Sequence, residues 1–213
     1  NRSVWSVTLR NCRVANGLNS CTVYNSHAPS DNMSTKFYYS YYYSLGANSQ
    51  AVEESSSHSS SEVTVDKDGV PTKLRKRTLS EDPATFRGRI NAGLRSVREA
   101  YPTASILLLT PVHRGFAYLS PKNVQPDESY ANTCGLFIDD YVAAVAEAGR
   151  IHSATVVDLF AESGVWPLSA AHARDYFNSD RAEGRTDILH PNTAGHRRMA
   201  DAIRPVLENL LMR

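Results

Sequence analysis

Two short apolar runs in the second half of the chain constrain the fold more than any other feature. Residues 105–110 (SILLLT) and 154–159 (ATVVDL) lie between turn signals, which is typical of strands buried on both faces of a sheet. Helical patterns precede, separate and follow them. This order predicts parallel βαβ units with helices on both sheet faces. We therefore expect an α/β fold whose site lies in loops at the carboxyl ends of the strands.

Apolar stripes at helical spacing predict three main helices. The first opens at Glu81-Asp82-Pro83, with acids at its N-terminal end, and ends at Tyr101-Pro102. The second covers residues 130–148 and stops at Gly149, and the third follows residue 192. Residues 170–177 are also expected to be helical. The stripes consist of Phe86, Ile90, Leu94 and Val97 in the first helix, Ile138, Tyr141, Val142 and Val145 in the second, and Met199, Ile203, Val206 and Leu210 in the third.

The first 80 residues carry weaker signals. Residues 3–9 fit a strand or the end of a helix, and residues 12–15 fit a short strand. Residues 36–45 (KFYYSYYYSL) predict a strand, whose tyrosines either pack or offer a stacking platform for bases or sugars. A serine-rich stretch at 53–62 predicts a mobile loop, and Asp68-Gly69 predicts a hairpin turn. We expect one domain over residues 1–213, with a flexible serine-rich insertion and a hairpin at about 50–80.

Composition excludes several classes of protein. The chain has 213 residues, of which 41% are hydrophobic and 21% charged, and its net charge is +1. It is therefore neither a disordered tail nor a generally basic nucleic-acid binder. The basic run at 73–77 (KLRKR) is then expected to be a solvated loop rather than a phosphate-binding patch. No apolar run approaches the roughly 20 residues that span a bilayer, so we expect neither a membrane span nor a nucleic-acid partner.

The cysteines Cys12, Cys21 and Cys134 are odd in number and lack the spacing of a metal site. Cys12 and Cys21 are either bridged, in an oxidising compartment, or free thiols. The chain also lacks a ligand cluster and a Gly-rich phosphate loop, so we expect neither a metal nor a cofactor. It opens at Asn1 without a charged-then-apolar signal segment, which predicts a processed or truncated N-terminus.

The run Asp187-Ile188-Leu189-His190-Pro191-Asn192 is the strongest chemical signal. A carboxylate three residues before an imidazole can reach it within one turn, fix its tautomer and stabilise its charged form. Asp187 and His190 are therefore candidates for a general base and the residue that orients it. Pro191 suits the first position of the following helix, where no amide hydrogen is needed. The alternative is a surface Asp and His at a helix start, with Asp187 or Asn192 acting only as a cap.

The wider run DILHPNTAGHRRMADAI resembles the last sequence block of the SGNH (GDSL-like) hydrolase family, D-x-x-H-P-N-x-x-G-H before a terminal helix. ILLLTPVHRG resembles the buried strand and loop of esterase-like members that act on carbohydrates, and the pattern runs from about Phe86 to Arg213. The resemblance implies a three-layer α/β/α sandwich on a mostly parallel sheet, similar to flavodoxin-like folds. It also implies a secreted or periplasmic serine esterase that hydrolyses ester or acetyl groups on a carbohydrate.

The resemblance also implies roles for particular residues. His190 would act first as base and then as acid, and Asp187 would orient it. Gly46-Ala47-Asn48-Ser49 follows the family's Gly-x-Asn-Asp block except at Ser49. Gly46 and Asn48 would therefore belong to the oxyanion hole, with the Asn48 side chain as a donor.

The family's nucleophile block, Gly-Asp-Ser, occurs nowhere in this chain. One hypothesis is an esterase whose serine lies upstream of Asn1 or is replaced. The alternative is a catalytically inactive, truncated SGNH-like domain that binds a glycan or has no role. A nucleotide-binding domain ranks below both, because no G-x-G-x-x-G follows a strand.

Two further candidates lie in the loop at 111–127, which leaves the first buried strand. Arg114 could bind a carboxylate or a sugar hydroxyl of the substrate, or be a surface cation. His113 is a candidate for substrate binding, although a structural role fits it better than that of a second base. We expect His196 to make a partly buried polar contact, and Asp158 either to cap a loop or to face the site.

Overall fold

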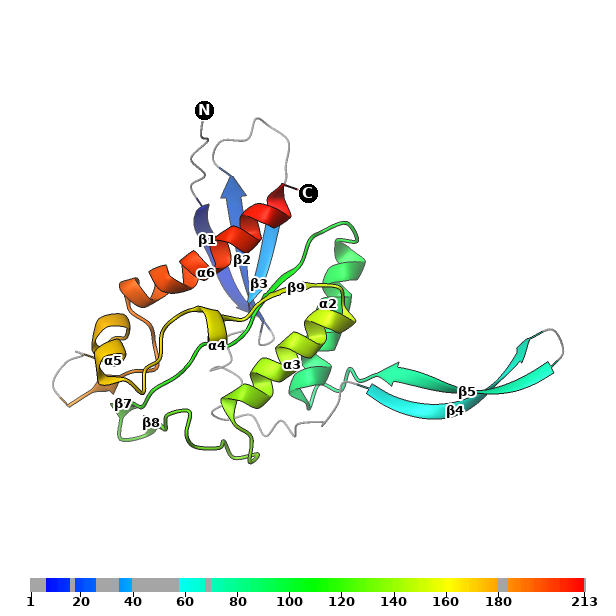
Figure 1. Cartoon of the computed structure of the whole chain (residues 1–213), viewed down its shortest axis with the longest axis horizontal. Helices are drawn as coiled ribbons and strands as arrows, with labels where there is room; N and C mark the ends of the chain where they lie inside the picture. Colours follow the sequence, from blue (N-terminus) through cyan, green and yellow to red (C-terminus); the bar gives the residue numbers. More distant parts are fainter. Residues whose placement is uncertain are drawn as a thin grey trace.

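The computed structural model describes residues 7–15, 18–25, 35–39, 58–67, 70–179 and 184–212. Within them, helices and small sheets form a mixed α/β structure, as predicted (Figure 1). The strands are β1 Val7–Ala15, β2 Leu18–Asn25, β3 Thr35–Tyr39, β4 His58–Lys67, β5 Val70–Leu79, β6 Leu107–Leu109, β7 Ala117–Ser120, β8 Asn123–Gln125, β9 Thr155–Val157 and β10 Thr186–Asp187. The helices are α2 Phe86–Ala100, α3 Ile138–Ile151, α4 Leu159–Glu162, α5 Ala170–Tyr176 and α6 Thr193–Leu211.

The two apolar runs form a parallel pair at the centre of the core. β6 and β9 are in register, with Leu107 opposite Thr155 and Leu109 opposite Val157. Because side chains alternate across a strand, Leu108 packs with α2 and α3, whereas Leu107 and Leu109 pack with α6. The predicted stripe of α6 is confirmed: Met199, Ile203, Val206 and Leu210 all pack on this second face.

The strands in the described ranges belong to four separate sheets: β1-β2-β3, β10-β7-β8, β4-β5 and β6-β9. Helices pack on both faces of β6-β9, while the three-layer sandwich on a mostly parallel sheet stays a prediction. α5 confirms the helix expected at 170–177. Within the same ranges, no helix combines the length and the apolar character needed to cross a bilayer.

Two expectations for residues 53–80 are wrong. Residues 58–62 are not a mobile loop but half of β4, with Ser60 opposite Arg77 and Glu62 opposite Arg75. The basic run at 73–77 lies on β5 rather than in a loop, although its side chains are exposed. Both errors have one cause: each strand satisfies the backbone hydrogen bonds of the other, which composition does not indicate. The hairpin itself is confirmed, and its turn at Asp68-Gly69 lies outside the described residues.

Strands occur where the weaker N-terminal signals predicted them. Residues 12–15 end β1, and the part of 3–9 that the structure describes begins it. Of the predicted strand at 36–45, residues 36–39 belong to β3 and the remainder lies outside the described residues. So do the side chains of Cys12 and Cys21, whose pairing stays an open prediction. The Cys134 side chain is exposed.

Helices α2 and α3 begin later than predicted, because side-chain hydrogen bonds hold the preceding backbone in other conformations. α2 begins after Thr85, whose hydroxyl accepts a hydrogen bond from Gly88 N at 3.0 Å, so Glu81 and Asp82 precede the helix. α3 begins eight residues later than expected, at Ile138. The Asn132 carboxamide accepts hydrogen bonds from Cys134 N and Leu136 N at 2.9 and 3.0 Å and forms a turn there. Asn competes with helix in this way because its side chain replaces the backbone acceptor.

Gly149 does not stop α3, which continues to Ile151. Instead, Gly149 allows α3 to approach β9 closely. A Cβ atom at this buried position would lie 2.2 Å from Val156 Cγ2 on β9 and 3.2 Å from the Ala154 carbonyl oxygen. Gly149 O also accepts a hydrogen bond from Ala154 N at 2.9 Å. The glycine therefore lets α3 lie directly against the strand that follows it.

We predict that Gly149→Ala destabilises the protein, although alanine is the better helix former by about 1 kcal/mol. Overpacking against Val156 should outweigh that gain and lower the free energy of unfolding by about 1–2 kcal/mol, measured by urea denaturation. Adding Val156→Ala removes the contacting methyl groups, so the double variant should lose less than the two single variants together. A higher unfolding midpoint for Gly149→Ala alone would contradict the close approach.

Candidate active site

The Asp187–His190 turn is attached to the loop that leaves β6. β10 pairs antiparallel with β7, which places Asp187 opposite Ala117. Gly115 N donates a hydrogen bond to Ile188 O at 2.9 Å, and Ile188 N donates one to Phe116 O at 3.0 Å. A Cβ atom at Gly115 would lie 2.5 Å from Ile188 Cγ2, so glycine is required for this contact. The two segments singled out in the sequence thus lie side by side.

A buried carboxylate holds the imidazole. Asp187 has an exposed fraction of 0%, and its two oxygens lie 2.9 and 3.1 Å from His190 Nδ1. Oδ1 also accepts hydrogen bonds from the backbone amides of His190 and Leu189, at 3.0 and 3.3 Å. The His190 side chain is 39% exposed. Holding Nδ1 in this way directs Nε2 to the opposite side of the ring, where it can take a proton from a hydroxyl group or water.

Capping is carried out by Asn192 and not by Asp187. The Asn192 side chain accepts hydrogen bonds from Ala194 N and Gly195 N at 2.8 and 3.1 Å and forms the N-cap of α6. Pro191 precedes this cap, so its predicted place at the first helical position is wrong by two residues. Asp187, buried beneath His190, does not fit the alternative of a surface capping residue.

The end of α5 supports the turn from a second direction. Asn178 donates to His190 O from its backbone and from its side chain, at 3.2 and 3.0 Å. Asn192 donates to Tyr176 O from its backbone at 2.9 Å and to Phe177 O from its side chain at 3.0 Å. The backbone on both sides of the imidazole is therefore held. Sequence reasoning missed Asn178, because a polar residue after a short helix carries no distinctive pattern.

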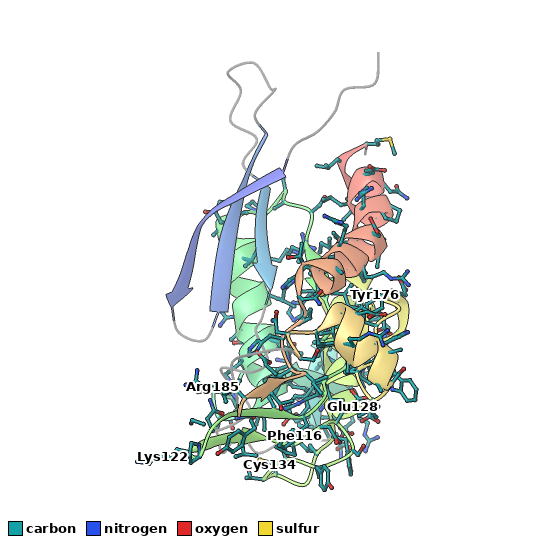
Figure 2. All side chains as sticks on the ribbon, turned by 90° about the vertical axis from the view of Figure 1, so that its left-hand side faces the viewer. Phe116, Lys122, Glu128, Cys134, Tyr176 and Arg185 are labelled. Carbon is teal, nitrogen blue, oxygen red and sulfur yellow. The ribbon has the colours of Figure 1, made fainter. Side chains whose placement is uncertain are left out.

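His113 forms a second carboxylate–imidazole pair, with Glu128. Their closest atoms, Nδ1 and Oε1, are 2.8 Å apart, and the imidazole stacks on Phe160 at 3.7 Å between ring centroids. Glu128 Oε2 also accepts from Arg114 N at 2.8 Å. Figure 2 shows Phe116 and Glu128 in the lower part of the molecule and Tyr176 of α5 above them. Glu128 was missed from the sequence, since nothing local links it to residues 113 and 114.

These contacts favour the structural role for His113. The Arg114 guanidinium also bonds within the loop, because its Nη2 donates to Pro126 O at 2.9 Å. The pair therefore shapes the loop beside the Asp187–His190 turn. Substrate binding by His113 and Arg114 stays a prediction.

The remaining candidates have simpler positions. Asp158 is the N-cap of α4 and accepts from Thr110 Oγ1 at 3.0 Å, which ties together the carboxyl ends of β6 and β9. His196 is exposed, so the predicted partly buried contact is wrong. Gly46 and Asn48 lie outside the described residues. In the described ranges, no three His, Cys, Asp or Glu side chains gather as a metal-binding group.

Comparisons with known proteins reach only part of the chain. No protein-family model matches it, and no curated protein matches it. One crystal structure is 28% identical over 61% of this chain and 54% of its own, with a TM-score of 0.51. A protein from Lactobacillus plantarum is 26% identical over 61% of this chain and 56% of its own, with a TM-score of 0.48. A possible lipase from Chitinophaga pinensis DSM 2588 is 21% identical over 62% and 63%, also with a TM-score of 0.48.

The chain therefore spans less than two thirds of the length of each of these structures. The first of them shows similarity of fold over the matched part. The reaction, the substrate and the partners of the whole protein are therefore proposals.

The geometry predicts the tautomer of His190. Because the Asp187 oxygens accept at Nδ1, the neutral imidazole should carry its proton there, which a long-range ¹H–¹⁵N spectrum of the histidine rings reports. Asp187→Asn should shift the population towards the other tautomer. Asp175→Asn alters an exposed carboxylate on α5 and is the matched control, which should leave the His190 signals in place. A proton on Nε2 in the unaltered protein would contradict the arrangement.

Proposed function

We propose that this chain belongs to an SGNH-type ester hydrolase that removes ester or acetyl groups, with a carbohydrate as the substrate class. The observation that carries the proposal is the hydrogen bond between the buried Asp187 carboxylate and His190 Nδ1. The resemblance of DILHPNTAGH to the family's last block supports it, as does the position of the turn beside the loop after β6. A secreted or periplasmic setting is part of the same proposal.

In the proposed reaction, a serine hydroxyl attacks the acyl carbon while His190 Nε2 takes its proton. Asp187 then stabilises the imidazolium through Nδ1. The imidazolium returns the proton to the leaving alkoxide, and water releases the acyl group by the same proton transfers. Asn48, with backbone amides, is the proposed donor to the oxyanion. The serine is not assigned to a residue of this chain.

We expect His190→Ala to lower the rate of p-nitrophenyl acetate hydrolysis by several orders of magnitude, because the serine loses its base. The assay uses the chain together with any native sequence upstream of Asn1. Asp187→Asn should lower the rate by roughly 10³–10⁴-fold, since an amide at this position favours the wrong tautomer. His196→Ala alters an exposed histidine on α6 and should hydrolyse the ester at the original rate. An unchanged rate after His190→Ala would reject the assignment.

The absence of Gly-Asp-Ser favours a second candidate, a non-catalytic SGNH-like domain that binds a glycan or has no role. The same ester assay on residues 1–213 alone separates the two candidates. Turnover above background that disappears with His190→Ala would reject the non-catalytic candidate. Turnover that is unchanged by the substitution would come from another group.

A further inference from the structure

The β4–β5 hairpin, residues 58–79, extends from the body of the molecule as an arm (Figure 1). Its two strands pair with each other and, in the described ranges, with no other strand. Val65 and Leu74 are 40% and 48% exposed, so the arm adds little to the apolar core. Its sequence is therefore not explained by packing.

The basic run on β5 faces short hydroxyl side chains. Arg77 lies opposite Ser60, Lys76 opposite Ser61, and Lys73 opposite Thr64. The exception is Arg75, opposite Glu62, whose carboxylate lies 3.2 Å from Lys73 Nζ. Opposite charges across a ladder stabilise a hairpin, yet Lys76 and Arg77 lie opposite serines. The serines carry no charge that would pair with these two long side chains, which are exposed to solvent and to a ligand.

A pocket of about 700 Å³ lies where the base of the arm meets the C-terminal end of α3. Its lining residues include two arginines from distant segments, Arg77 of the arm and Arg150 of α3, together with His58, Ser59 and Ser60. The acidic wall residue, Glu147, is held by Arg87, whose Nε lies 2.7 Å from Oε2. The pocket thus combines positive charge with hydroxyl donors, and it adjoins the basic face of β5, which carries Arg77, Arg75 and Lys73.

We propose that this pocket and the adjoining basic face bind an acidic polysaccharide. Guanidinium groups pair with carboxylate or sulfate oxygens through two parallel hydrogen bonds, so Arg77 and Arg150 hold one acidic group of the polymer. Ser60, which lies on the same face as Arg77, bonds a sugar hydroxyl beside it. Further along the same face of β5, Arg75 and Lys73 carry one positive charge more than Glu62 neutralises, and they attract the next acidic groups of the polymer.

Two observations favour a glycan over nucleic acid. Residues 58–79 contain no Phe, Tyr or Trp on which a base could stack. The net charge of +1 lacks the basic excess of nucleic-acid binders. The choice of a glycan also rests on the proposed esterase function, whereas the anion site rests on the pocket alone.

The test is titration calorimetry of residues 1–213 with polygalacturonate, heparin and neutral dextran at low salt. We expect binding to an acidic polymer, weakened by added NaCl through screening, and none to dextran. The carboxylate and sulfate arms identify which acidic group is preferred. Arg77→Gln with Arg150→Gln should raise the dissociation constant about tenfold, because two charge-assisted contacts are lost.

The matched control is Arg197→Gln with Arg204→Gln, which removes the same charge from exposed positions on α6. Binding by this variant should stay within about twofold of the original. Equal weakening by both double variants would overturn the site in favour of a general charge effect. Tighter binding of duplex DNA would overturn the choice of a glycan, and no binding to either acidic polymer would leave the cations with only a solubilising role.

The ester assay separates this site from the proposed function. Arg77→Gln with Arg150→Gln should hydrolyse p-nitrophenyl acetate at the original rate, because neither residue contacts the Asp187–His190 turn. If the ester assay rejects the esterase proposal but polygalacturonate still binds, the anion site is supported without the proposed function. If the protein hydrolyses the ester but binds neither acidic polymer, only the anion site is rejected.

Discussion

The burial of the Asp187 carboxylate is the constraint on which the rest of the site depends. Removing a charge from water costs several kcal/mol unless donors replace the solvent. Three of the donors come from the turn itself: the His190 imidazole and the amides of His190 and Leu189. These hydrogen bonds form only when the turn has this conformation. The position of the imidazole is therefore a consequence of a buried charge that must be satisfied.

That turn keeps its place because two other segments bind its backbone. Gly115 and Phe116 hold Ile188 from the side of β7, and Asn178 holds the His190 carbonyl from the side of α5. The loop before β7 leaves the carboxyl end of β6, which lies in the core between α6 and the α2–α3 layer. A short run of backbone hydrogen bonds thus connects the parallel pair to the imidazole. The β4–β5 arm takes no part in these hydrogen bonds, so its cations are available for a separate role.

The elements predicted best were those with a strong apolar period. Both buried strands and the stripe of α6 were recognised because burial on a helix or strand imposes spacing on the sequence itself. Errors occurred where a side chain or a distant strand decided the backbone. Asn132 delays α3 by forming a turn, and Gly149 continues the helix that it was expected to end. The serine-rich residues of β4 gain their structure from β5, which no local pattern reveals.

The sequence by itself determined that a carboxylate and an imidazole would meet within one turn, and that Asn192 would be available to cap the following helix. Those are contacts between residues three or fewer positions apart, and spacing alone controls them. Only the tertiary structure decided that Asp187 is buried, that Asn178 and Gly115 support the turn, and that Glu128 pairs with His113. The same is true of Arg77 and Arg150, which share a pocket although they lie on different elements. Burial and contact between distant segments depend on packing, which a linear pattern does not contain.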